Sequence, residues 1–130
     1  MTTNDKRQTM NKLRILENAR ELYLEINNII IPMLDKNELF SIGNQLTRAS
    51  LSIVLNIREG NSYNDGRKTN LFNIAMGSCE ESDECIYLLS MKYSIIDYDS
   101  YNDRLMHIKY TLSNIIHPNN RQSLVDGRLS

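Results

Sequence analysis

The sequence contains few of the residues that interrupt helices. Its 130 residues include only two prolines, Pro32 and Pro118, and five glycines. Proline ends or kinks a helix and glycine weakens it, so their scarcity favours long helices. No alternation of apolar and polar residues between hairpin turns indicates a competing β-sheet. An all-α domain is therefore the predicted fold class.

The chain also lacks the features of several functional classes. Its formal net charge is −1, from 15 basic and 16 acidic residues, whereas proteins held mainly by phosphate contacts usually carry a basic excess. No apolar run reaches the length of a membrane span, and the polar residues 1–8 lack the apolar stretch of a signal peptide. These absences predict a cytoplasmic protein with no membrane partner.

Nucleophiles and metal ligands are equally sparse. Cys79 and Cys85 lie six residues apart in a segment predicted as helix, which points their side chains in different directions, so we expect reduced thiols. His107 and His117 lack the neighbouring ligand spacing of a metal site. No phosphate-binding glycine motif or oxyanion loop occurs. We therefore expect no catalytic residue, no enzyme activity, no metal and no cofactor.

Four segments of the chain carry apolar residues at helical spacing. The predicted helices span about residues 6–31, 38–59, 67–93 and 100–117. Pro32 is expected to end the first helix, and Gly60 is expected to cap the second. Because the connectors are short, neighbouring helices should run antiparallel. We predict a single up-and-down four-helix bundle over residues 1–118 and a polar tail at 119–130.

The second predicted helix is apolar around much of its girth. One stripe, which includes Leu46, Ile53 and Ile57, suits a core, and Leu51 and Leu55 add apolar surface on other faces. A helix with this pattern is buried on several sides. It therefore lies centrally or contributes to a subunit interface, and we expect the protein to form a homo-oligomer.

Polar residues lie on or beside the apolar stripes of the second and third predicted helices. They are Arg48, Ser52, Asn56, Glu59 and Glu81. An ionised group among apolar side chains is costly unless it is paired, so we predict a buried network that joins Arg48 and Asn56 to Glu81. Two interpretations remain open, because such residues either determine helix register or line a ligand or nucleic-acid site.

The same residues carry a family resemblance. Residues 45–60 read QLTRASLSIVLNIREG and resemble the signature Q-x-x-R-A-x-x-S-I-x-x-N-I-x-E-G, and residues 74–81, IAMGSCEE, resemble I-A-x-G-S-x-x-E. Both signatures are typical of the four-helix bundle proteins encoded in intervening sequences of 23S ribosomal RNA genes. The accessory variability proteins of diversity-generating retroelements are more distant relatives.

The resemblance implies an up-and-down four-helix protomer, a ring-shaped homo-oligomer that is typically a pentamer, and no catalytic activity. In the retroelement relatives the ring binds a reverse transcriptase and nucleic acid through basic surface. Relatives usually carry a dense basic cluster after the Glu-Gly pair, whereas residues 61–68 contain only Arg67 and Lys68 as basic residues. These two, with Arg58 and Tyr63, are the candidate nucleic-acid contacts.

Two functional hypotheses follow. The first is a non-enzymatic, oligomeric accessory protein that acts as a scaffold for RNA or for an enzyme of nucleic acids. The second is a purely structural or protein-interaction ring with no nucleic-acid role, which the near-neutral net charge favours.

Overall fold

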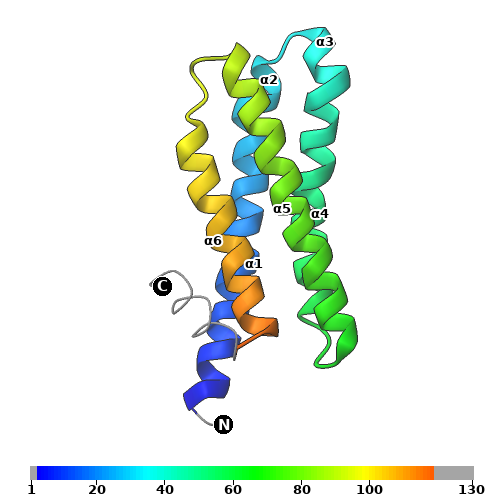
Figure 1. The fold of residues 1–130 in the computed structure, drawn as a ribbon, viewed down its shortest axis with the longest axis vertical. Coiled ribbons are helices and arrows are strands. Elements are labelled where there is room, and N and C mark those ends of the chain that lie inside the picture. The colour runs from blue at the N-terminus through cyan, green and yellow to red at the C-terminus, as the bar shows by residue number, and fades with distance from the viewer. Residues whose placement is uncertain (1–2, 119–130) are drawn as a thin grey trace, which may run out of the picture.

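The computed structural model describes residues 3–118, and the regular elements in this part of the chain are all helical (Figure 1). In chain order they are α1 (Thr3–Glu25), the π-helix η1 (Ile26–Ile30), α2 (Ile31–Met33), α3 (Lys36–Glu38), the π-helix η2 (Leu39–Gly43), α4 (Asn44–Gly60), α5 (Gly66–Lys92) and α6 (Tyr98–Ile116). The first three elements form one rod and the next three form a second. The predicted four-helix bundle is therefore confirmed, whereas the predicted tail at 119–130 lies outside the described residues.

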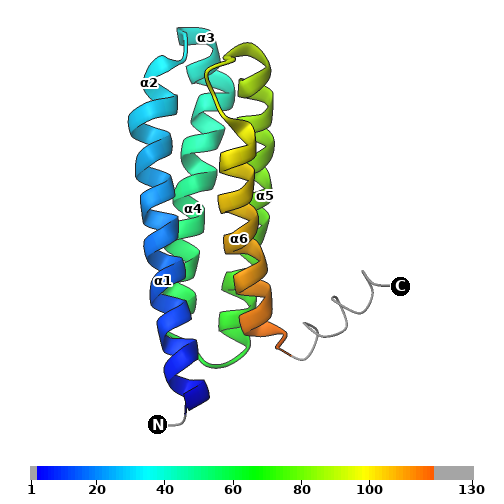
Figure 2. The ribbon, with the colours of Figure 1, turned by 90° about the vertical axis from the view of Figure 1, so that its left-hand side faces the viewer.

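The four rods surround a common axis, and each runs antiparallel to the next in the chain (Figures 1 and 2). α1 packs against α4 and α6, and α5 packs against the same two helices, so α1 and α5 are diagonal partners. The start of α1, the loop at residues 61–65 and the end of α6 share one end of the bundle (Figure 2). Residues that are distant in sequence therefore meet at this end.

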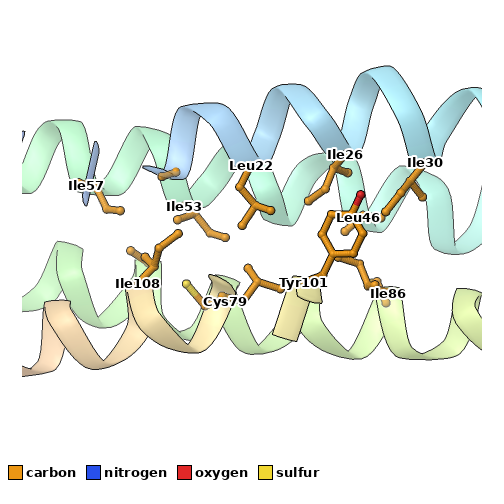
Figure 3. Close-up of a cluster of buried hydrophobic side chains, with 14 of the residues drawn as sticks. Leu22, Ile26, Ile30, Leu46, Ile53, Ile57, Cys79, Ile86, Tyr101 and Ile108 are labelled. Atoms are coloured by element: carbon orange, nitrogen blue, oxygen red, sulfur yellow. The ribbon is translucent and has the colours of Figure 1, made fainter. Parts of the chain in front are cut away.

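The core is aliphatic, as the scarcity of aromatic residues in the sequence leads one to expect. Figure 3 shows side chains from all four rods converging on the axis, among them Leu22, Ile53, Ile86 and Ile108, each at most 1% exposed. Burying one such side chain contributes roughly 1.5–3 kcal/mol. The helical spacing of apolar residues in the sequence thus identifies the face that is buried.

The first rod does not end before Pro32, and the expectation that it would was wrong. The helix continues through Pro32 to Met33, and it is preceded by the π-helical turn η1. In that turn the N–H of Ile31 reaches the carbonyl of Ile26, five residues back. A π turn widens the helix, and this gives the proline ring room that a regular turn denies it. Leu34, in extended conformation, ends the rod instead.

Each seam between neighbouring rods carries at least one hydrogen bond or ion pair between polar side chains. Examples are Asn27–Thr47 between the first rod and α4, Ser52–Ser78 between α4 and α5, Asp83–Tyr98 between α5 and α6, and Glu25–Arg104 between α6 and α1. A polar pair inside a packed seam loses its hydrogen bond if one helix slides along the other. These pairs therefore define the register of all four helices.

Candidate functional site

The thiols are buried and the imidazoles lie at the surface. Cys79 and Cys85 are free and buried, and burial raises the pKa of the Cys79 thiol to about 12. His107 and His117 are both exposed at the surface. Within residues 3–118 no cluster of His, Cys, Asp or Glu has a geometry that could hold a metal ion. No helix of this part of the chain is long and apolar enough to cross a membrane.

Several exposed apolar side chains lie on η2, α4 and α5. We call this surface the α4–α5 face and define it by Phe40, Gln45, Arg48, Leu51, Leu55, Ile74, Glu81 and Leu88. Among its apolar members, Leu55 is 55% exposed and Ile74 is 52% exposed. A groove of about 430 Å³ lies at one end of the face, between Phe40, Gln45, Glu81 and Leu88. The sequence predicted the extra apolar surface of the second helix but not its continuation on α5.

The predicted buried network does not form within the protomer. The antiparallel register places Arg48 level with Glu81, as the hypothesis required, but both side chains are exposed. Among the described residues no hydrogen bond or ion pair joins Arg48 to Asn56 or to Glu81, and Glu59 is also exposed. The prediction that Glu81 is buried was wrong because of the rotation of α5 about its own axis. Ser78 and Cys85 are buried, whereas Glu81 points outward.

A smaller network of neutral groups occupies the seam instead. The Oγ of Ser78 donates to the Oγ of Ser52 at 2.8 Å, and the Nδ2 of Asn56 donates to the same oxygen at 3.0 Å. Asn56 also donates to the main-chain carbonyl of Ser52 at 2.8 Å. Neutral hydrogen-bonded groups avoid the desolvation penalty of a buried ion pair. Of the predicted residues, Ser52 thus joins α4 to α5, whereas the hydrogen bonds of Asn56 stay within α4.

Gly60 of the Glu-Gly pair has a packing role rather than the predicted capping role. It is the last residue of α4, and the following Asn61 keeps right-handed helical angles. A Cβ at Gly60 would lie 2.5 Å from Cε1 of Phe72, whose side chain is fully buried. Glycine is required here because the aromatic ring of α5 approaches the backbone of α4 closely.

The candidate nucleic-acid contacts gather at the end of the bundle that contains the loop at 61–65. The guanidinium of Arg67 lies 4.0 Å from the ring centroid of Tyr63 and also pairs with Asp65 at 2.7 Å. Asp65 caps α5 by accepting from the N–H of Arg67. Arg58 lies exposed in the last turn of α4. The structure therefore brings Tyr63 and Arg67 into direct contact, while the charge of Arg67 is partly offset by Asp65.

Lys12 joins this group from α1, although no sequence pattern predicts it. Lys12 acts electrostatically on Lys68, although α1 and α5 are diagonal partners in the bundle. Burial and the neighbouring Lys12 together lower the pKa of Lys68 to about 8. We call Lys12, Arg58, Arg67 and Lys68 the basic end. No local pattern marks Lys12, because its role depends on which loop covers the end of the bundle.

Comparison with known proteins places this architecture in a family. No curated protein matches the chain. A crystal structure from Bacteroides thetaiotaomicron VPI-5482, described as a protein of unknown function from the S23 ribosomal protein family, is similar, with a TM-score of 0.72 and 25% sequence identity. The match covers 82% of this chain and 97% of that chain. The family model of the 23S rRNA-intervening sequence proteins matches residues 11–117. The chain therefore belongs to the 23S rRNA-intervening sequence protein family.

Proposed function

We propose that this protein is a self-associating helical scaffold that performs no chemistry of its own. The α4–α5 face carries the proposal, because Leu51, Leu55, Ile74 and Leu88 leave apolar surface exposed along two adjacent helices. Exposed apolar surface of this kind, rimmed by polar residues, is typical of an interaction site. None of these four side chains belongs to the buried core cluster, so their exposed surface is available for contacts outside the protomer.

A second copy of this chain is the partner that the charges of the face favour. Arg48 on α4 and Glu81 on α5 are opposite charges that lie level with each other and are both exposed. If α4 of one copy meets α5 of the next, each contact brings one of these cations to one of these anions. Such a head-to-tail contact generates a ring if the rotation closes. The ring, and the pentamer that the family resemblance implies, are part of this proposal.

Replacing Leu55 by aspartate is expected to dissociate the assembly. Leu24→Asp is the matched control, because Leu24 and Leu55 are both 55% exposed and lie on different helices. Light scattering coupled to size-exclusion chromatography should give a multiple of 15.1 kDa for the wild type and for Leu24→Asp, but about 15.1 kDa for Leu55→Asp. Circular dichroism should show equal helicity for all three. A wild-type protein that elutes as a monomer would contradict the proposal.

Charge reversal extends the same experiment. Arg48→Glu and Glu81→Arg should each weaken association, because each places like charges opposite one another. The double variant restores opposite charges and should recover much of the lost association. If the double variant associates no better than either single variant, Arg48 and Glu81 do not meet between copies, and the arrangement of α4 against α5 is wrong.

RNA association is the second candidate function, and the basic end favours it. Three of its four cations come from the last turn of α4 and the first turn of α5, and one of them, Arg67, lies over the ring of Tyr63. Cations bind phosphates and an aromatic ring stacks on unpaired bases, so the group suits single-stranded RNA. The rest of the near-neutral surface would then serve self-association.

Neutralising Arg58 is expected to weaken RNA binding. Arg58→Gln should lower the affinity for a single-stranded RNA severalfold and reduce the slope of log affinity against log salt by about 0.7, the value for one lost phosphate contact. Fluorescence anisotropy at several salt concentrations measures both quantities. Lys36→Gln is the control, because Lys36 is an exposed lysine on α3, at the opposite end of the bundle (Figure 1). Folded wild-type protein that binds no RNA at low salt would remove this candidate and leave the scaffold intact.

A further inference from the structure

We propose that the seam between α1 and α6 is a docking groove for a basic, amphipathic helix of a partner protein. Figure 1 shows α1 and α6 on one side of the bundle and α4 and α5 on the other. Self-association through the α4–α5 face would therefore leave the α1–α6 seam free. The inference goes beyond the proposed scaffold, because it adds a second contact surface that does not depend on the first.

Two adjacent cavities follow this seam. One, of about 270 Å³, reaches Met33 at the end of the first rod, and the other, of about 250 Å³, reaches back to Asn18. Arg104 lines both cavities, and we call the two together the α1–α6 groove. The distance from Asn18 to Met33 is roughly 20 Å along a helix, so a helix of about 14 residues matches the length of the groove.

The cavity nearer α2 is apolar and lacks a partner within the protomer. Ile30 and Ile96 are buried and lie beneath it, whereas Ile29 and Ile95 line it from the surface. Ile95 is 80% exposed, the highest value among the large hydrophobic residues of the described chain, and Ile29 is 53% exposed. An apolar side chain of a partner would bury both residues, as the anchors of protein interfaces do.

The second cavity carries negative charge that no neighbour offsets. Glu21 and Asp103 line it, and both are exposed. Among the described side chains, no ion pair involves either carboxylate. The guanidinium of Arg104 is already paired with Glu25. The two free carboxylates therefore favour a cationic side chain next to the apolar anchor.

These two halves together define the partner. A helix that lies in a groove between two helices presents its anchors at positions i, i+3, i+4 and i+7, and a basic amphipathic helix places cations beside them. A nucleic acid does not fit, because Glu21 and Asp103 would repel its phosphates. The groove thus suits a protein segment that is both apolar and basic, whereas the basic end suits RNA.

A model peptide tests the groove directly. A fluorescent amphipathic peptide of leucine and lysine, about 14 residues long, should bind the full-length protein with a Kd in the micromolar range at low salt, measured by fluorescence anisotropy. A peptide of leucine and glutamate in the same pattern should bind at least tenfold more weakly. Ile95→Ser should lower the affinity for the basic peptide roughly 3–10-fold, because it removes an apolar wall. Glu21→Gln combined with Asp103→Asn should lower it severalfold and reduce its salt dependence.

Leu88→Ser is the matched control, because Leu88 lies in the groove of the α4–α5 face, which also contains two carboxylates, Glu81 and Glu84. This variant should retain the affinity of the wild type for the basic peptide, whether or not its oligomeric mass falls. Loss of affinity in Leu88→Ser but not in Ile95→Ser would place the peptide on the α4–α5 face and overturn the proposal. Equal binding of the two peptides, or no binding of either, would also overturn it.

The oligomeric mass separates this inference from the proposed scaffold. Ile95→Ser should leave the mass of the wild type unchanged, because the α1–α6 groove is reserved for a different protein. A lower mass for Ile95→Ser would mean that a second copy covers the groove, and the proposal would be wrong. The response of the mass to Leu55→Asp tests the scaffold in either case.

Discussion

Replacing Phe72 by alanine is expected to lower the free energy of unfolding by about 3–5 kcal/mol. The side chain is fully buried and is one of only two phenylalanines in the chain, the other being the exposed Phe40. It fills the space where α4 ends and α5 begins, against the backbone of Gly60. Its removal leaves a cavity lined by the ends of helices, which can collapse only if the loop at 61–65 moves.

Urea denaturation followed by circular dichroism measures this loss. Tyr110→Ala is a suitable control, because Tyr110 is an aromatic residue of α6 that is 47% exposed, and its truncation should change stability by roughly 0.5 kcal/mol or less. A loss below about 1 kcal/mol for Phe72→Ala would show that the ring does not fill this end of the core.

Replacing Gly60 by alanine is expected to destabilise the protein by about 1–3 kcal/mol, although alanine is the better helix former. The new methyl group would lie 2.5 and 2.6 Å from two carbons of the Phe72 ring, and a fully buried ring cannot move aside easily. Gly77→Ala is the matched control. A Cβ at Gly77 has no neighbour within 4 Å, so that substitution should raise stability by about 0.5–1 kcal/mol.

The combination of the two substitutions tests the contact itself. Once Phe72→Ala removes the ring, Gly60→Ala should cost nothing, or add up to about 1 kcal/mol from helix propensity. The coupling between the two sites in a double-mutant cycle should therefore exceed about 1 kcal/mol. Additive effects would mean that Gly60 is required for another reason, such as the geometry of the loop that follows it.

The Glu-Gly pair shows what a sequence pattern can predict and what it cannot. The position of Gly60 at the end of α4 could be predicted from the apolar residues that precede it and the polar loop that follows. Its partner Phe72 could not, because the contact depends on how α5 returns across the end of α4. A local pattern reports helix boundaries, whereas a contact between helices depends on their rotation about their own axes.

Rotation also explains the outcome for the polar residues of the signature. Arg48 of α4 and Glu81 of α5 lie at similar levels along their helices, because Ser52 faces Ser78 in the antiparallel register. They were wrongly expected to be buried, because Ser52 and Ser78 face each other and turn both charges outward. The basic end shows the same limit, since Lys12 and Lys68 are 56 positions apart in the sequence and only the fold brings the start of α1 and the start of α5 to the same end of the bundle (Figure 2).

The sequence alone therefore determines the scarcity of helix breakers, the four apolar stripes and the short connectors, and these are sufficient for an all-α up-and-down bundle. They are sufficient because the 3.6-residue period and the connector length are local properties of the chain. Only the tertiary structure decides which polar residues enter the seams, which charges stay on the α4–α5 face and which basic residues share the basic end. Those features depend on how four helices rotate to fill one core, and close packing couples the rotation of each helix to all the others.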